Sequence, residues 1–194
     1  MLTDINESGK RVAGIVENML SFARKNDEAP SSQDLNALIN KTVELAATDY
    51  DLKKQYDFKT IKIVKKFDNM IPLVPCDAGK IQQVLLNILR NGAQAMQDAC
   101  VERATFTLRT YLDTDNGMVC LEIEDNGPGM EALISKRIFE PFFTTKPVGV
   151  GTGLGLSVSY FIVVENHGGE MSVESKLGKG AKFIVRLPLA GVSV

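Results

Sequence analysis

The first part of the chain repeats apolar residues with the period of an α-helix. From residue 1 to about residue 25 they recur three and four positions apart, and additional apolar residues widen the stripe. A stripe this wide is typical of a helix in a bundle, although a helix packed on its own domain would also show it. The positions are Ile5, Val12, Ile15, Val16, Met19, Leu20, Phe22 and Ala23.

A polar, proline-containing stretch ends this pattern. Residues 27–33 predict a linker, so we divide the chain into a helix over 1–26 and a domain over 34–190. Within that domain a second helix is expected from about Asp34, and residues 59–67 alternate as a strand. The expected buried side of the second helix carries Leu35, Leu38, Ile39, Val43, Leu45 and Ala46.

The clearest helical pattern runs from Asp77, a predicted N-cap, to Asp98. Its apolar residues fall on one face, and Asn87 and Asn91 lie at the border between that face and solvent. An asparagine oxygen is a neutral ligand that suits a Mg²⁺ ion whose other ligands are phosphate oxygens and water. The pattern alone does not separate such ligands from two ordinary surface asparagines.

Residues 118–125 alternate as a strand and stop at the turn sequence DNGPGM. Asp, Asn, Gly and Pro are the residues of ordinary turns. A carboxylate at a strand end, followed by Gly127 and Gly129, also suits a site where a flat ring lies against bare backbone. An ionised Asp125 would accept a hydrogen bond from the exocyclic amine of adenine, whereas guanine presents an acceptor at that position.

A glycine-rich stretch, GVGTGLGL at residues 149–156, precedes an expected helix from Thr152 to Asn166. Glycines at a helix start let free N–H groups and the positive dipole end approach an anion; a flexible linker is the alternative. The spacing fits neither the Walker A pattern nor GxGxxG. Two strands joined by a turn with Gly178 and Gly180 close the domain.

The segment before the glycine-rich stretch, residues 131–150, is long enough to form a lid. Three aromatic residues in it, Phe139, Phe142 and Phe143, are expected to anchor it by packing. Lys146 would reach a phosphate or remain a solvated surface lysine.

The composition argues against several classes of function. The 194 residues carry a net charge of −2, without the basic surface expected of a nucleic-acid-binding protein. The three cysteines form no CxxC pair, so neither a disulfide framework nor a zinc site is indicated. No apolar run reaches the ~18–20 residues that span a membrane, and no signal-peptide pattern is present. These features favour a cytoplasmic domain and leave open a membrane anchor elsewhere in a longer protein.

Taken in order, these motifs resemble the catalytic, ATP-binding domain of sensor histidine kinases, in the family shared with type II topoisomerases, Hsp90 and MutL. The resemblance covers roughly residues 34–188. Residues 11–24, RVAGIVENMLSFAR, also resemble the second helix of the family's dimerisation and phosphotransfer hairpin, which favours the bundle interpretation. The matching motifs are the N box at 83–96 (QVLLNILRNGAQAM), the first glycine box at 125–130 (DNGPGM), the F box at 138–147 (IFEPFFTTKP), the second glycine box at 149–160 (GVGTGLGLSVSY) and the closing strands at 167–188.

The resemblance implies an α+β fold, a two-layer sandwich of a mixed, mostly antiparallel sheet against helices, preceded by one long helix. It implies ATP and Mg²⁺ as ligands, with Asn91 as the metal ligand and Asn87 as a catalytic neighbour one turn earlier. Asp125 would hold the adenine amine. The other implied nucleotide contacts are Gly127, Gly129, Lys146, Gly151, Thr152, Gly153, Leu154 and Gly155.

The implied reaction transfers the γ-phosphoryl group of ATP to a histidine and then to a response-regulator aspartate. In the family that histidine lies in the first hairpin helix, which we expect to lie outside these 194 residues. The chain is therefore predicted not to phosphorylate itself. The implied partners are the histidine helix, a response regulator and, through the N-terminal helix, a second copy of the chain. His167, the single histidine, has a structural position in the family.

Other functions of the same nucleotide site stay open. An ATP hydrolase of the gyrase or Hsp90 type has a glutamate where this chain has Asn87, and a protein-serine kinase shares the site. A nucleotide-sensing or dimerising module would need no catalysis. Three positions depart from the family pattern: Gly92 replaces a frequent alanine and should weaken its helix, Ala181 replaces a frequent threonine, and the segment before His167 is one residue longer.

Overall fold

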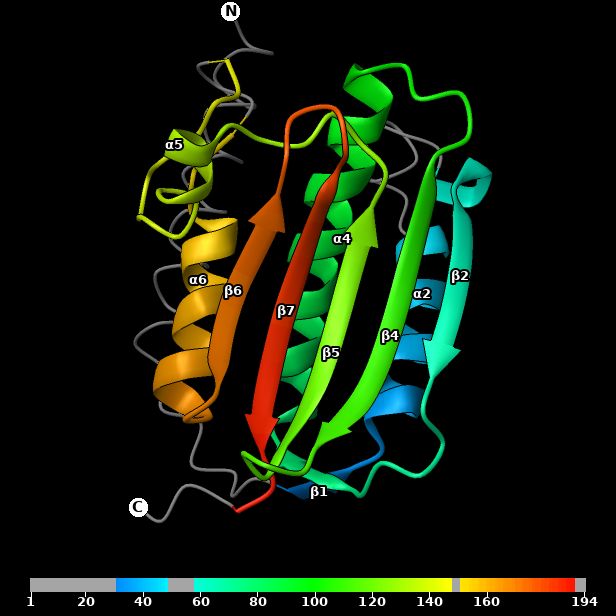
Figure 1. The fold of residues 1–194 in the computed structure, drawn as a ribbon, viewed down its shortest axis with the longest axis vertical. Coiled ribbons are helices and arrows are strands. Elements are labelled where there is room, and N and C mark those ends of the chain that lie inside the picture. The colour runs from blue at the N-terminus through cyan, green and yellow to red at the C-terminus, as the bar shows by residue number, and fades with distance from the viewer. Residues whose placement is uncertain (1–30, 49–57, 148–150, 191–194) are drawn as a thin grey trace, which may run out of the picture.

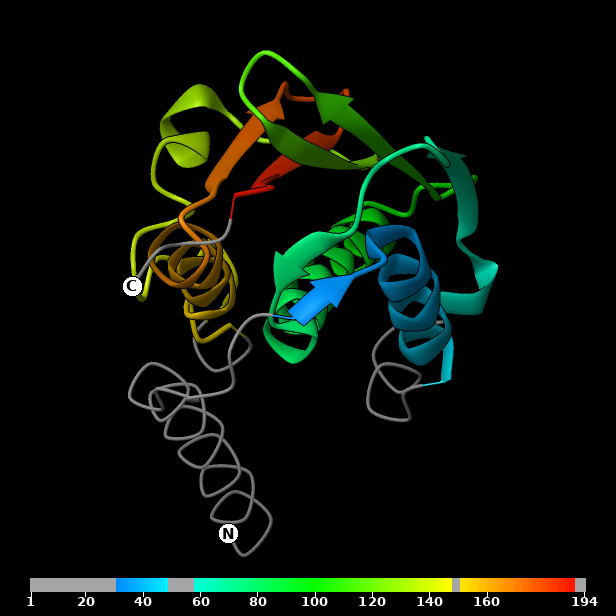
Figure 2. The same cartoon turned by 90° about the horizontal axis from the view of Figure 1, so that it is seen from below.

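A computed structural model describes residues 31–48, 58–147 and 151–190. The predicted helix over 1–26, the first part of the predicted linker and the start of the glycine-rich stretch lie outside these residues. In the described part, a five-stranded sheet packs against a layer of helices (Figure 1). Seen from below, the long helices all lie on one face of the sheet (Figure 2). The predicted two-layer α+β architecture is confirmed.

The main sheet has the strand order β2-β4-β5-β7-β6. Its first two strands are parallel, and every other neighbouring pair is antiparallel. A parallel pair needs a long crossover, and here the chain from β2 to β4 passes through α4, the longest of the described helices. The strands are β2 (Lys62–Phe67), β4 (Thr105–Asp113), β5 (Met118–Asp125), β6 (Glu170–Ser175) and β7 (Ala181–Pro188).

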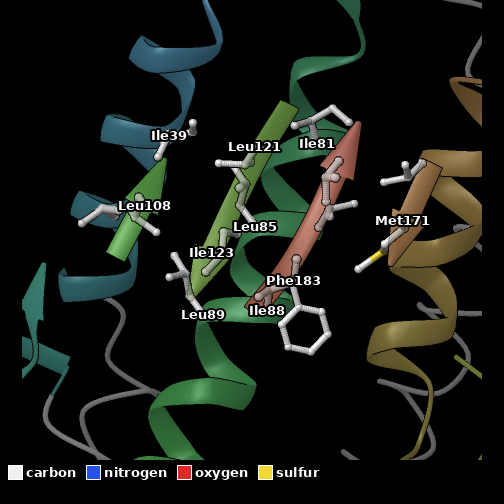
Figure 3. Close-up of a cluster of buried hydrophobic side chains, with 14 of the residues drawn as sticks. Ile39, Ile81, Leu85, Ile88, Leu89, Leu108, Leu121, Ile123, Met171 and Phe183 are labelled. Atoms are coloured by element: carbon white, nitrogen blue, oxygen red, sulfur yellow. The ribbon is translucent and has the colours of Figure 1, made fainter. Parts of the chain in front are cut away.

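Helix α4 (Ala78–Asp98) lies behind the centre of the sheet and contributes more residues to the core than any other described element. Figure 3 shows its leucine and isoleucine side chains, such as Leu85 and Ile88, beside those of β5, such as Leu121 and Ile123. Asp77 accepts a hydrogen bond from the Lys80 N–H, which confirms the predicted N-cap. The other helical segments are α2 (Leu35–Thr48), η1 (Phe58–Thr60), α5 (Ala132–Ser135), α6 (Gly155–Phe161) and its π-helical continuation η2 (Ile162–Asn166).

The predicted linker is wrong at its end, because Ser31–Gln33 form strand β1. This strand pairs antiparallel with β3 (Val74–Cys76) and makes a separate two-stranded sheet. Three polar residues carry no alternating apolar pattern, so their sequence gives no strand signal. The pairing depends on the partner strand, in which Val74 and Cys76 are fully buried.

Helix α2 follows the predicted pattern except at Leu45, which is 41% exposed. Thr42 takes a place in the buried stripe instead, and its hydroxyl donates to the Leu38 carbonyl at 2.8 Å. A threonine can be buried in a helix when its hydroxyl bonds a carbonyl one turn back. The helix predicted from Thr152 begins only at Gly155, because residues 151–154 form the loop that precedes it.

The extra residue before His167 is accommodated by the π-helical turn of η2. His167 ends that turn and is buried. Its Nδ1 lies 2.7 Å from the Ile162 carbonyl oxygen, and its Nε2 accepts from the Asp77 N–H at 3.1 Å. The imidazole is therefore neutral, with its proton on Nδ1, and it ties η2 to the first turn of α4. This is the structural role that the sequence predicted.

We expect His167 to make the fold less stable in acid. Burial lowers the pKa of His167 below its ordinary value of 6.5, against the raising effects of the Ile162 carbonyl and Asp77. As the pH falls, His167 therefore takes up a proton in the unfolded chain before it does so in the folded chain. The contribution of His167 to stability should be constant above pH ~6.5 and should fall below it until the lowered pKa is reached. Urea unfolding between pH 5 and 8 measures this slope.

The matched variant is His167→Phe, which keeps the ring and removes both hydrogen bonds. It should lose about 1–3 kcal/mol of stability at pH 8, because the Asp77 N–H and the Ile162 carbonyl lose a partner. Its stability should also vary less between pH 5 and 7. An equal pH dependence of stability in the two proteins would contradict the role of neutral, buried His167 in the loss of stability in acid.

Candidate functional site

A cavity of about 540 Å³ opens between α4, the turn after β5 and the segments 134–146 and 151–156. Its volume lies in the range of small-molecule and cofactor sites. All the predicted site residues line it except Gly127 and Leu154. The predicted residues that line it are Asn87, Asn91, Asp125, Gly129, Lys146, Gly151, Thr152, Gly153 and Gly155.

Gly127 and Leu154 support the cavity wall from behind. The Gly127 N–H donates to Asp125 Oδ1 at 2.9 Å. Leu154 is buried, and its carbonyl accepts from the Val158 N–H and the Ser157 hydroxyl in the first turn of α6. Gly127 therefore holds the Asp125 side chain in place, and Leu154 stabilises the first turn of α6.

Asp125 ends β5 with its carboxylate in the cavity wall. Its Oδ1 accepts from two backbone N–H groups, Gly127 at 2.9 Å and Ala181 at 3.3 Å. Within the described residues, Oδ2 has no hydrogen-bond partner. Burial raises the pKa of Asp125, while the two N–H donors oppose that shift. The carboxylate is therefore held by one oxygen, and the other is left as an acceptor for a ligand.

The turn after Asp125 is fixed by a residue that sequence reasoning did not select. The Asn126 side chain accepts from the Thr105 N–H at 2.8 Å and donates to the Arg103 carbonyl at 2.9 Å. Both partners are more than twenty residues away, so an asparagine in a turn sequence gave no signal beyond local turn preference. Asn126 holds the cavity rim against the start of β4.

Gly129 lets the turn pack against the β6–β7 hairpin. Its φ is +67°, and a Cβ atom there would collide with the Lys176 carbonyl oxygen. Next to it, the Met130 N–H donates to Ser175 Oγ at 2.9 Å. The bare backbone predicted here is therefore required by the packing, whether or not a ring also lies on it.

Asn87 is occupied by contacts with helix α6. Its Nδ2 donates to the Gly155 carbonyl at 3.0 Å and to Ser159 Oγ at 3.2 Å. These bonds connect α4 to the helix that follows the glycine-rich loop. The side chain positions that loop.

Asn91, one turn later, presents its oxygen to a lysine. Lys146 Nζ donates to Asn91 Oδ1 at 3.2 Å and to Gln94 Oε1 at 2.7 Å. Burial lowers the pKa of Lys146, an effect that Asp98 opposes and Arg90 reinforces. Lys146 and Arg90 are the cationic residues among the described lining residues, so this end of the cavity suits an anionic ligand.

The donor set at Asn91 fits a magnesium ion that arrives with phosphate. No cluster of three or more His, Cys, Asp or Glu side chains that could hold a metal exists among the described residues. A single amide oxygen is too little for a resident metal ion. It is enough for Mg²⁺ that takes its other ligands from phosphate oxygens and water.

The loop before α6 is shaped by Gly153. Its φ is +67°, and its carbonyl accepts from the Phe142 N–H at 3.0 Å. Phe142 itself has φ +65° and is 64% exposed, so the packing predicted for this ring is wrong. Phe139 does pack, with its ring centroid 5.3 Å from that of Tyr160, and Phe143 lies under the Arg137 guanidinium at 4.4 Å. The three rings differ because the Gly153 contact fixes the Phe142 backbone and turns its side chain outward.

Comparison with known proteins agrees with this fold. The family described as histidine kinase-, DNA gyrase B- and HSP90-like ATPases matches residues 76–191. The chain is 30% identical to the sensor protein TdiS of Thauera aromatica over 97% of its own length and 32% of that protein. It is 34% identical to the signal transduction histidine-protein kinase AtoS of Escherichia coli K12 over 90% of its length and 26% of AtoS. The chain thus spans about a third or less of these relatives.

Solved structures give the same result. The catalytic domain of the histidine kinase ThkA aligns with a TM-score of 0.64 and 29% identity, covering 82% of this chain and 97% of that domain. Full-length ShkA in complex with AMPPNP aligns with a TM-score of 0.76 and 27% identity over 99% of this chain and 39% of ShkA. This chain belongs to the histidine kinase-, DNA gyrase B- and HSP90-like ATPase family, and within that family it is similar to the catalytic domains of sensor histidine kinases. Among the described helices, none is both long and apolar enough to cross a bilayer.

Proposed function

We propose that this chain binds Mg-ATP in the cavity and transfers the γ-phosphoryl group to a histidine on a separate hairpin helix, for relay to a response-regulator aspartate. The observation that carries this proposal is the geometry of Asp125. One carboxylate oxygen is held by two backbone N–H groups, and the other is left for a donor such as the adenine amine. Guanine presents an acceptor there, so the site should prefer adenine.

Each part of the cavity has a role in this reaction. Asp125 would fix the base. Asn91 would offer Oδ1, which accepts from Lys146 in the structure, to a magnesium ion that would neutralise phosphate charge when bound. Lys146 and the cavity-lining residues of the glycine-rich loop, Gly151, Thr152, Gly153 and Gly155, would face the phosphates. The histidine nitrogen attacks the γ-phosphorus, the bond to the bridging oxygen breaks, and ADP leaves. The protein contributes mainly positioning and charge neutralisation, as phosphoryl transfer requires.

The ATP hydrolase alternative lacks a base in this cavity. Asp125 is the one carboxylate among the described lining residues, and we assign it to the nucleotide base. Asn87 occupies the position of the hydrolase glutamate, has no useful basicity, and is bonded to α6. These contacts favour transfer to a protein nucleophile over activation of water.

The partners follow from the same assignment. We propose that residues 1–26 form the second helix of a dimerisation hairpin, that a response regulator docks on the assembled kinase, and that the domain works in the cytoplasm. The structure of ThkA in complex with the response regulator TrrA, which aligns at 26% identity with a TM-score of 0.72, supports the second of these proposals.

The test is phosphoryl transfer in trans. Incubated alone with γ-labelled Mg-ATP, the chain should gain no acid-labile label, since both nitrogens of buried His167 are engaged. Addition of the phosphoacceptor hairpin of the full-length kinase should place phosphohistidine on the hairpin. Label on His167, or fast ATP hydrolysis without transfer, would contradict the proposal.

A pair of asparagine variants controls that experiment. Asn91→Ala should lower transfer at least about tenfold, because it removes the proposed metal ligand. Asn116→Ala should leave transfer unchanged, because Asn116 bonds Asp113 in the exposed β4–β5 turn. Equal transfer by the two variants would exclude Asn91 as a ligand.

A further inference from the structure

Three residues from three elements meet beside the free oxygen of Asp125. Phe106 on β4 is the direct register partner of Asp125 on β5, so the two side chains share the face that packs on α4. Gly92 of α4 is buried against both of them and lines the same cavity. A glycine within a 21-residue helix weakens the helix, so this position calls for a steric reason.

The steric reason is the Phe106 ring. A Cβ atom on Gly92 would lie 2.7 Å from Phe106 Cε1, 2.8 Å from Cζ and 3.3 Å from Asp125 Oδ2. The ring has little room to retreat, since Phe106 is 1% exposed and stacks on Phe58 at 6.1 Å between centroids. The volume that a methyl group would need is already filled by the far edge of the ring.

The Asp125 carboxylate could move away from an added Cβ atom only by rotating. Its Oδ1 is held by the Gly127 and Ala181 N–H groups. Pressure on Oδ2 would therefore rotate the carboxylate about that anchored oxygen. The oxygen displaced by such a rotation is the one left for the ligand.

We propose that Gly92 and Phe106 are a matched pair of positioning residues that set Asp125 Oδ2 for adenine recognition. This inference rests on the proposed role of Asp125. A chain with alanine at position 92 requires a smaller side chain at position 106. Leucine meets that requirement, because it lacks atoms at the Cε1 and Cζ positions of the ring.

The test compares ATP with purine riboside triphosphate, which has the same phosphates and sugar but no exocyclic amine. Calorimetry gives the ratio of the two affinities for each protein. The wild type should prefer ATP at least about tenfold, the range of a hydrogen bond to a charged group. Gly92→Ala should reduce this preference to about threefold or less, because it lowers the affinity for ATP alone. The double variant Gly92→Ala/Phe106→Leu should restore it.

Gly79→Ala is the control for glycine replacement in the same helix. A Cβ atom there makes only an ordinary contact at 3.4 Å, with Asp77 Oδ1, so the preference should not change. General damage to the fold would lower the affinities for both nucleotides equally and leave the ratio of the two affinities constant. Should Gly92→Ala not fold, recovery of folding and of the preference in the double variant supports the pair, and failure to recover either overturns it.

The outcomes separate this inference from the proposed function. A wild type that binds both nucleotides equally would refute recognition of the amine by Asp125. A wild type that prefers ATP, with Gly92→Ala keeping the same preference, would refute the matched pair and leave the proposed function standing.

Discussion

Replacing Asp125 with asparagine is expected to lower the affinity for ATP by about 2–3 kcal/mol, roughly 30- to 150-fold. The asparagine oxygen would keep the two N–H donors of Gly127 and Ala181, because they need an acceptor. The amide NH₂ would then face the ligand and oppose the adenine amine, donor against donor. The same NH₂ can donate to guanine O6, so the preference for ATP over GTP should shrink or reverse.

Calorimetric titration with both nucleotides measures this change, and Asp113→Asn at the end of β4, where Asp113 bonds Asn116 of the exposed β4–β5 turn, is the matched control. Acid should mimic the substitution in the wild type. Burial raises the pKa of Asp125 above 3.8, so ATP affinity should fall as the pH drops through that raised value. Asp125→Asn should lack this part of the pH dependence. An unchanged ATP affinity in Asp125→Asn would remove Asp125 from the site.

The second large effect is expected from Gly180→Ala, which should destabilise the fold by more than about 4 kcal/mol and abolish nucleotide binding. Gly180 has φ +83°, and a Cβ atom there would collide with the Asp125 carbonyl oxygen. The Cβ position is fixed by the backbone of residue 180 and the oxygen belongs to the backbone of Asp125, so rotating a side chain cannot remove the collision. The Gly180 carbonyl also accepts from Ser175 Oγ at 2.8 Å, which in turn holds the turn at Met130.

Gly178→Ala separates the clash from the backbone strain. Gly178 lies in the same turn with φ +78°, but a Cβ atom there would have no neighbour within 4 Å. Its substitution should cost only about 1–2 kcal/mol, the penalty of a side chain in the left-handed region. Urea unfolding of both variants gives the comparison. Similar losses in the two variants would show that the contact with Asp125 is not what selects glycine at position 180.

The sequence predicted the elements that carry strong local patterns. Helix α4 begins at its predicted cap and ends at Asp98, as expected. The closing hairpin has its glycines in the turn. The weak cases were those that tertiary contact decides. Strand β1 forms because Val74 and Cys76 offer an edge, and Leu45 lies outward because Thr42 fills the stripe.

The site was predicted as a set of residues, and the allocation of its hydrogen bonds was not. The Asn87 amide donates to Gly155 and Ser159, 68 and 72 residues away. Lys146 reaches Asn91 across 55 residues. Motif order brings such residues into one cavity, but which oxygen accepts from which donor depends on packing. The same limit explains Gly92, which the sequence marks as a helix weakener and the fold places against Phe106.

The most direct measurement is a crystal structure of this chain with Mg²⁺ and a non-hydrolysable ATP analogue. We expect the adenine amine within hydrogen-bond distance of Asp125 Oδ2, Asn91 Oδ1 on the metal, and the phosphates beside residues 151–155. A nucleotide bound outside this cavity, or bound in it with the base turned away from Asp125, would contradict the proposed site.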